Sequence, residues 1–294
     1  MRILTYTVPL EEDGRMVKGI LRGGLQLSYT LLKSLKWREN AILLNGQSVH
    51  VNAIVHAGDV VSVALSERAP REDLYCANAA KPDIVYEDDD LLVLNKPAGV
   101  AMHPKSGDAS APSLAAMLTS YLGEGSVPHF VSRLDKGTSG LLIAAKSGYV
   151  HDRLRRALHS SDLRREYRAV AVGRVEPPCG VIDAPIGRAE GSIIRRCVRA
   201  DGLPSLTEYE TLQVSGRFTL LRLRPQTGRT HQLRVHMSYL GYPLAGDWLY
   251  GTEDKALIHR PALHSYELWF THPVTEQELH FTASIPQDMQ RLIE

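Results

Sequence analysis

The stretch SRLDKGTSGLLIAA, residues 132–145, joins a turn of small and charged residues to an uninterrupted apolar run. The apolar run, 141–145, predicts a buried β-strand that begins just after the turn. Within the turn, Asp135 lies between Arg133 and Lys136, and nearby cations favour the ionised carboxylate. An ionised carboxylate at a loop–strand junction is a candidate nucleophile or base. A structural ion pair at the surface has the same pattern, so both interpretations stand at this point.

Strand patterns dominate the chain from residue 83 onward. The expected strands lie at 84–86, 91–94, 141–145, 167–172, 181–182, 193–198, 208–214, 219–223, 262–270 and 278–283. They occur in adjacent pairs joined by short turns, such as Ser215-Gly216-Arg217, and do not alternate with helices. Helical patterns are found at 113–122, 151–159 and 231–240. This order favours an α+β fold with a mixed, mainly antiparallel sheet over a doubly wound parallel sheet.

The first 70 residues have the pattern of a small separate unit. Helical spacing is approached by Leu21, Leu25, Leu31, Leu32 and Leu35, and basic residues share the same turns. An apolar run then meets Asn45-Gly46, a strong hairpin signal. Basic helices followed by a hairpin predict a small RNA-binding domain at 1–70. Residues 71–82 lose this periodicity and predict a linker, after which 83–294 form the second domain.

The charges are balanced in number but segregated along the chain. The 294 residues contain 34 Lys and Arg against 33 Asp and Glu, a net charge of +1. Residues 14–38 contain six basic side chains and no acid, and residues 211–246 contain five arginines and no acid. Segregated charge predicts one basic face, which is typical of a protein that binds a polyanion. Arginines that merely cover solvated strands and helices would give the same pattern.

The sequence lacks the motifs that mark several classes of protein. Three cysteines without a CxxC spacing, Cys76, Cys179 and Cys197, indicate reduced thiols. The N-terminus has acids where a secretory signal needs an apolar block, and no apolar run approaches the ~18 residues of a membrane span. We therefore expect a cytoplasmic protein without membrane contact. GxSxG, Walker and GxGxxG motifs are absent, and the five-residue spacing of His231 and His236 does not fit a metal site.

A second segment, PQTGRTHQLRVH at 225–236, has the pattern of a turn that enters a helix. Gly228 permits an unusual backbone conformation, and Thr230 is a candidate helix cap. Arg229 would then lie at the helix entry beside free N–H groups, where anions are favoured.

Five blocks of the sequence resemble the RluA family of RNA pseudouridine synthases. They are RLDKGTSGLLIAAKS (133–147), NKPAGVAMHP (95–104), REYRAVAVG (165–173), GRTHQLRVHMSYLGYPLAGDWLYG (228–251) and ALHSYELWFTHP (262–273). The blocks occur in the family's order and span about 84–285. More weakly, residues 1–70 resemble a small RNA-binding domain shared with a small-subunit ribosomal protein. The resemblance implies the pseudouridine synthase fold for 83–294.

The resemblance also implies an activity and a set of site residues. The family converts specific uridines of structured RNA to pseudouridine without cofactor or metal, after the base is flipped out of its stack. Asp135 matches the family's essential aspartate, which attacks either the ribose or the base. Tyr167 matches the tyrosine that stacks on the target base, and Arg229 matches the basic residue that pairs with the aspartate. Arg133 matches an arginine near the flipped nucleotide, and Leu268 an apolar pocket residue.

One position departs from the family pattern and leaves alternatives open. Ser132 stands where the family usually has His before Arg-Leu-Asp. A catalytically silent RNA-binding protein on the same fold is therefore the alternative to an enzyme, and a hydrolase that uses Asp135 on an unrelated fold is a third hypothesis. For the enzyme we expect a monomer that acts on RNA, with ribosomal RNA rather than transfer RNA as the substrate.

Overall fold

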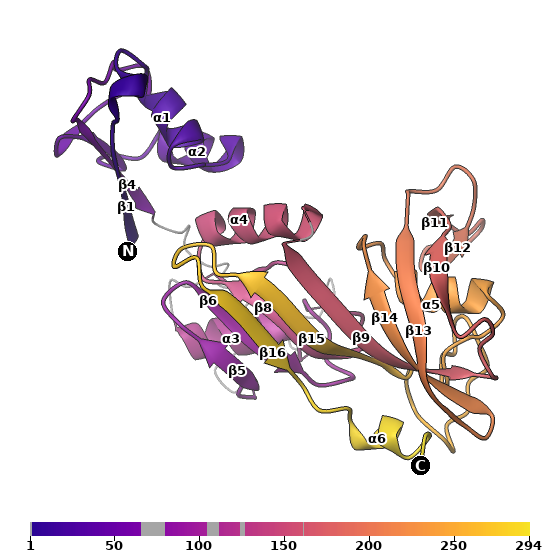
Figure 1. Ribbon diagram of the computed structural model, residues 1–294. Coiled ribbons are helices and arrows are strands. Elements are labelled where there is room, and N and C mark those ends of the chain that lie inside the picture. Colours follow the sequence, from indigo (N-terminus) through magenta and orange to yellow (C-terminus); the bar gives the residue numbers. More distant parts are fainter. Residues whose placement is uncertain (1, 66–79, 105–111, 124–126, 161) are drawn as a thin grey trace.

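The computed structural model describes residues 2–65, 80–104, 112–123, 127–160 and 162–294. Two separate sheets divide these residues into an N-terminal unit and a larger second unit (Figure 1). The expected linker, 71–82, lies mostly outside the described residues. Within the described residues, no helix is long and apolar enough to cross a membrane.

The N-terminal unit packs two short helices against a four-stranded antiparallel sheet. The sheet has the order β1-β4-β2-β3, with β1 (Arg2–Thr7), β2 (Ile42–Leu44), β3 (Gln47–Ser48) and β4 (Val60–Leu65). The helices are α1 (Val17–Gly23) and α2 (Tyr29–Leu35), preceded by the 3₁₀ turn η1 (Leu10–Glu12). Positive φ angles at Asn45 and Gly46 (51° and 82°) make the predicted tight hairpin turn. The sequence analysis missed β1, which lies at the edge of the sheet and exposes Ile3.

A ten-stranded mixed sheet organises the second unit. Its main path has the order β10-β13-β14-β9-β15-β8-β6-β5, with β16 paired to β15 and β7 to β8. The strands are β5 (Ile84–Glu87), β6 (Leu91–Lys96), β7 (His129–Phe130), β8 (Ser139–Ala145), β9 (Leu163–Val172), β10 (Cys179–Asp183), β13 (Leu206–Ser215), β14 (Phe218–Pro225), β15 (Leu263–Thr271) and β16 (Glu278–Thr282). Every pair is antiparallel except β15 with β8. The predicted α+β class with a mainly antiparallel sheet is confirmed.

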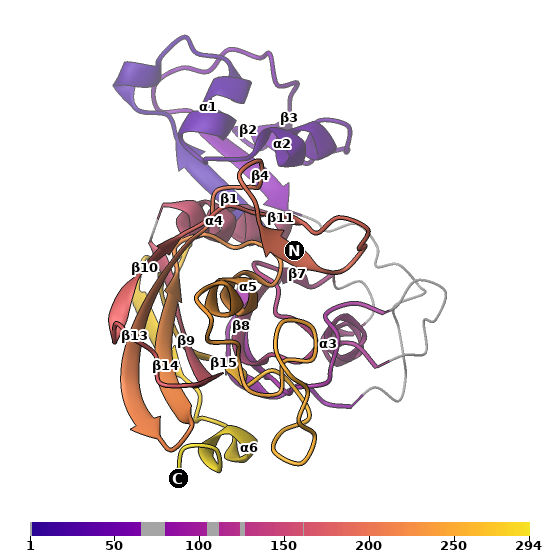
Figure 2. The same cartoon turned by 90° about the vertical axis from the view of Figure 1, so that its right-hand side faces the viewer.

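Helices cover both faces of this sheet. They are α3 (Leu114–Leu122), α4 (Gly148–His159), α5 (Gln232–Tyr239) and α6 (Gln287–Gln290). Successive strand residues face opposite sides, so Leu141 and Leu142 of β8 belong to different cores. Leu141 shares its core with Leu154 of α4, whereas Leu142 shares its core with side chains of α3 and α5. Figures 1 and 2 both show α4 and α6 at opposite ends of the second unit.

The strand predicted at 193–198 is only partly correct. Strand β12 is limited to Arg196–Val198 and pairs with β11 (Ile186–Arg188) in a separate two-stranded sheet. Ile193 and Ile194 lie in the connection and are exposed, so their apolar character did not indicate burial. The short elements β7, β11 and α6 were not predicted, because two to four residues carry too little periodicity to detect.

Candidate active site

A basic cavity of about 640 Å³ opens where the 132–138 loop, α4, β9 and the start of α5 meet. Its lining contains one carboxylate, that of Asp135. The Lys and Arg side chains that line it are Arg133, Lys136, Arg155, Arg165, Arg229 and Arg234. Such an excess of cations over acids favours a polyanionic ligand.

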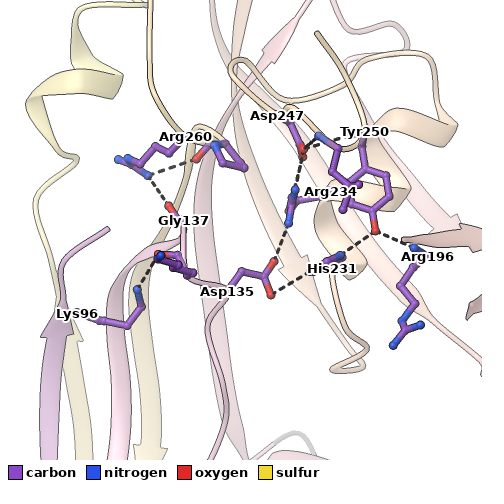
Figure 3. Close-up of polar contacts among 12 residues, drawn as sticks. Lys96, Asp135, Gly137, Arg196, His231, Arg234, Asp247, Tyr250 and Arg260 are labelled. Carbon is purple, nitrogen blue, oxygen red and sulfur yellow. Dashed lines mark hydrogen bonds and ion pairs between the residues drawn. The ribbon is translucent and has the colours of Figure 1, made fainter. Parts of the chain in front are cut away.

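Two buried cations hold the backbone of the loop that carries Asp135. Lys96, which is fully buried, donates from Nζ to the carbonyl oxygens of Pro97 and Val100 at 2.9 Å and of Lys136 at 3.3 Å. Burial, and then the charge of Arg260, lowers the pKa of Lys96 to about 8. Arg260 donates to the carbonyl oxygen of Gly137 at 3.3 Å. These contacts hold the main chain just after Asp135, at Lys136 and Gly137, without touching its carboxylate (Figure 3).

The loop then enters β8 through a glycine that no other residue could replace without a backbone shift. Gly140 has a φ of 106°, and a Cβ there would lie 2.2 Å from the carbonyl oxygen of Ser265. Backbone of this kind is open to glycine because it lacks a Cβ. The predicted loop–strand junction therefore results from the close approach of β8 to β15.

The carboxylate of Asp135 is paired with Arg234 of α5. Nη1 of Arg234 lies 3.3 Å from Oδ2 of Asp135, and the same guanidinium makes two 2.7 Å hydrogen bonds to Asp247. Arg234 and Asp247 are 5% and 0% exposed, whereas Asp135 is 28% exposed. A buried guanidinium held by one carboxylate thus presents its remaining edge to a second carboxylate that the cavity can reach.

His231 approaches the other oxygen of Asp135. Its Nε2 lies 3.9 Å from Oδ1, and its Nδ1 is 2.8 Å from the hydroxyl of Tyr250. That hydroxyl also accepts the backbone N–H of Arg196 at 2.9 Å. The imidazole of His231 therefore lies between the Tyr250 hydroxyl and the carboxylate of Asp135 (Figure 3). Burial lowers the pKa of His231, opposed by the charge of Asp135.

The predicted pairing of Arg229 with Asp135 is wrong. Arg229 lines the cavity, but its Nε donates to the carbonyl oxygen of Pro204 at 3.1 Å. His231 adopts a left-handed backbone with a φ of 60°, and this kink separates Arg229 from the helix. Arg234, one turn into α5, therefore faces Asp135 instead.

The predicted cap of α5 is also wrong. His231, not Thr230, is the N-cap residue, and it makes no side-chain cap hydrogen bond. Gln232 stabilises the helix entry instead, because its Oε1 accepts the N–H of Arg229 at 3.0 Å and the hydroxyl of Thr227 at 2.8 Å.

The other predicted residues divide between the cavity and the core. Tyr167 of β9 and Arg133 of the loop both line the cavity, as does Ser132. His103, from the 95–104 block, also lines it and packs its ring edge against Phe130. Burial, and then the charge of Arg133, lowers the pKa of His103. A histidine ring is therefore present in the cavity although Ser132 replaces the family's usual His.

Leu268 does not line the cavity, so its predicted place in the pocket is wrong. It is 2% exposed and packs in the core that contains Leu154 of α4. Leu263, at the start of β15, lines the cavity instead. The two leucines are five positions apart, about 17 Å along the strand, which places Leu268 well away from the cavity-lining Leu263.

In the part of the chain that the structure describes, one group of potential metal ligands is found, and it lies outside the cavity. Oxygens of Asp88 and Asp90 and a ring nitrogen of His272 fall within 4.8 Å of one another. Nδ1 of His272 accepts the backbone N–H groups of Val274 and Thr275, so its proton lies on Nε2, 3.0 Å from Asp88. A protonated Nε2 has no lone pair for a metal, so its contact with the Asp88 carboxylate needs no metal ion.

The sequence analysis missed the residues that support Asp135. Lys96 and Arg234 lie inside the quoted blocks 95–104 and 228–251, but nothing in their spacing shows that they are buried. Asp247 offered a usable signal, because it is the first acid after the acid-free segment 211–246. A lone acid beside five arginines is a natural partner for one of them.

The sequence pattern of a family described as RNA pseudouridylate synthase matches residues 90–239. An uncharacterized RNA pseudouridine synthase of Bacillus subtilis, YjbO, is 39% identical over 273 residues, covering 92% of this chain and 96% of that protein. Ribosomal large subunit pseudouridine synthase D of Vibrio parahaemolyticus is 40% identical over 310 residues, covering 99% and 94%. The solved structure of human RNA pseudouridylate synthase domain containing 4 is similar with a TM-score of 0.56 and 26% identity, covering 71% and 90%. The chain therefore belongs to the RluA family of RNA pseudouridine synthases, which are isomerases.

Proposed function

We propose that the protein converts specific uridines of ribosomal RNA to pseudouridine, with Asp135 as the nucleophile. The observation that carries this proposal is the single carboxylate in a cavity lined by six Lys and Arg side chains. A polyanionic substrate would be held by the cations, and Asp135 is the group among them that can attack. Its pairing with the buried Arg234 holds the carboxylate in place for attack.

The reaction is an isomerisation, so the site has to supply no atoms to the product. The C1′–N1 bond breaks, C5 bonds to C1′, the proton on C5 leaves and N1 gains a proton. Tyr167 is 6% exposed on the cavity wall, next to the space that a flipped base would fill. We assign it the role of stacking on the uracil, because base–aromatic stacking offsets part of the cost of unstacking.

The preference for ribosomal RNA is supported by the names of relatives. Similar proteins from Vibrio parahaemolyticus and Vibrio cholerae are named ribosomal large subunit pseudouridine synthase D. Large-subunit ribosomal RNA is accordingly the substrate to test first.

The test is tritium release from RNA labelled at C5 of uridine, with separate ribosomal and transfer RNA substrates. We expect release from ribosomal RNA, and a pseudouridine map of total RNA that loses one or more ribosomal sites when the gene is deleted. Release from transfer RNA alone would overturn the choice of substrate. RNA binding without release from either substrate would favour the catalytically silent alternative.

A further inference from the structure

One face of α4 forms a wall of the active-site cavity. His151, Arg155 and His159 are spaced by four residues, so they lie one above another along the helix. All three line the cavity. The opposite face of the helix packs Val150 and Leu154 into the core. Packing therefore fixes the rotation of α4 and keeps this face, which we call the α4 cavity face, directed into the cavity.

Arg155 is the permanently charged side chain of the α4 cavity face. Within the described residues, the structure records no ion pair or hydrogen bond for its exposed side chain. Its neighbours on the helix are occupied: Arg156 bonds to Asp152 at 2.6 Å, and Arg153 to the hydroxyl of Tyr149 at 3.1 Å. The arginine that faces the cavity is thus the one left available for a ligand.

The charges across the cavity point to the ligand. Arg133 and Arg229 line the same cavity from other segments, with Asp135 among them. A uridine that reaches Asp135 must leave its stack, and the phosphates on either side must then lie at the cavity mouth. A guanidinium binds phosphate through two parallel hydrogen bonds, whereas an unpaired carboxylate here would repel it.

We propose that the α4 cavity face binds the RNA backbone beside the flipped-out uridine, with Arg155 on a phosphate. This inference rests on the proposed function, since it assumes that the target uridine enters at Asp135. His151 and His159 extend the contact along the helix at intervals of about 6 Å. Burial, then the charges of His129 and Arg155, lowers the pKa of His151, so it contributes a neutral hydrogen-bonding group.

The experiment compares Arg155→Glu with Arg156→Glu in the full-length protein. The two variants change the net charge equally and differ in which side of α4 they alter. Turnover and affinity are measured with an in vitro transcript of large-subunit ribosomal RNA at several salt concentrations. For Arg155→Glu we expect KM to rise about tenfold or more, as for loss of one charge-assisted hydrogen bond. The slope of log affinity against log salt should become shallower by about one, while kcat at saturation stays within about twofold.

Arg156→Glu is the matched control and should change KM by less than about threefold, with the wild-type salt slope. Equal effects of the two variants, or a wild-type KM and slope for Arg155→Glu, would overturn the proposal. Tritium release and RNA binding are recorded separately. If wild type binds the transcript but releases no tritium, the proposed function fails, while the affinities of the two variants still decide the role of the α4 cavity face. If wild type does not bind the transcript, both fail.

Discussion

Asp135 is held from two sides. Contacts to the 132–138 loop hold its backbone, whereas residues at the start of α5 face its carboxylate. On the loop side, Lys96 donates to main-chain carbonyl oxygens, and Arg260 donates to the carbonyl oxygen of Gly137 as well as to the carboxylate of Asp288. On the α5 side, Arg234 and His231 face the carboxylate oxygens themselves. Different residues therefore hold the backbone near Asp135 and orient its carboxylate. Substitutions on the two sides should give different kinetic signatures.

The largest effect is expected for Arg234, the direct partner of the carboxylate. Arg234→Gln should lower kcat by about a thousandfold, because it removes the cation that stabilises ionised Asp135. It also leaves the buried Asp247 without its partner, which typically costs about 3–5 kcal/mol of stability. Arg234→Lys keeps the charge but loses the planar fork, so it should fold better and recover part of the activity.

Arg229→Gln is the control for that experiment, since Arg229 belongs to the same segment but does not contact Asp135. Its kcat should stay within a few-fold of wild type while KM rises, because Arg229 lines the cavity and faces no carboxylate there. Saturation kinetics of the three variants decide the assignment. A large loss of kcat in Arg229→Gln with near-normal kcat in Arg234→Gln would reverse it.

On the loop side, Lys96→Met should lower kcat by about a hundredfold. The reason is misplacement of the loop, since small displacements of a reacting group have effects of this size. The pH dependence of kcat tests whether the ammonium of Lys96 holds the loop in place. Protonated Lys96 has three N–H groups for its three carbonyl oxygens, and loss of a proton near its pKa of about 8 withdraws one donor. Wild-type kcat should therefore decline above pH 8 through this group, and the decline should be absent in Lys96→Met.

The free energy of unfolding should also depend on the protonation of Lys96, but it should rise with pH where kcat falls. The pKa of Lys96 is about 8 in the folded protein, against 10.5 for an ordinary lysine. Between these values the unfolded chain binds more protons than the folded chain, so the free energy of unfolding contributed by Lys96 rises with pH. Urea titrations from pH 7.5 to 10 measure this contribution as wild type minus Lys96→Met. Parallel curves for the two proteins would rule out a titrating Lys96.

A smaller effect is expected for His231, which lies 3.9 Å from Asp135. His231→Asn should lower kcat about tenfold, because asparagine tolerates the left-handed backbone but cannot reach the carboxylate. Tyr250→Phe removes only the hydroxyl that orients the imidazole, and should lower kcat by a few-fold. Single-turnover rates at saturating RNA measure both. An unchanged rate in His231→Asn would show that Arg234 alone supports Asp135 from the α5 side.

The sequence was most informative where local pattern decides structure. Asp135 between two cations, before an apolar run, predicted the loop and strand that the structure contains, and Asn45-Gly46 predicted its hairpin. The pattern failed for Arg229 and Arg234, which are five residues apart in a segment rich in arginine. Arg234 takes the place predicted for Arg229 because His231 has a left-handed backbone. Helix propensity does not predict such a backbone for a residue other than glycine.

Burial was the second quantity that local pattern did not contain. Lys96 is a lysine at the end of an apolar strand, and sequence alone makes it a surface residue. It is buried at the end of β6, where its ammonium group donates to the carbonyl oxygens of Pro97, Val100 and Lys136. The prediction for Leu268 failed for a different reason. It is an apolar residue on the correct strand, but it lies too far along that strand to reach the cavity.

The most direct test of the central claim, that Asp135 is the reacting group, is tritium release by Asp135→Asn. The amide keeps the shape of the side chain but loses its nucleophilicity. At saturating RNA labelled at C5 of uridine, we predict no release above the background without enzyme, with affinity for RNA within a few-fold of wild type. Substantial pseudouridine formation by Asp135→Asn would contradict the account.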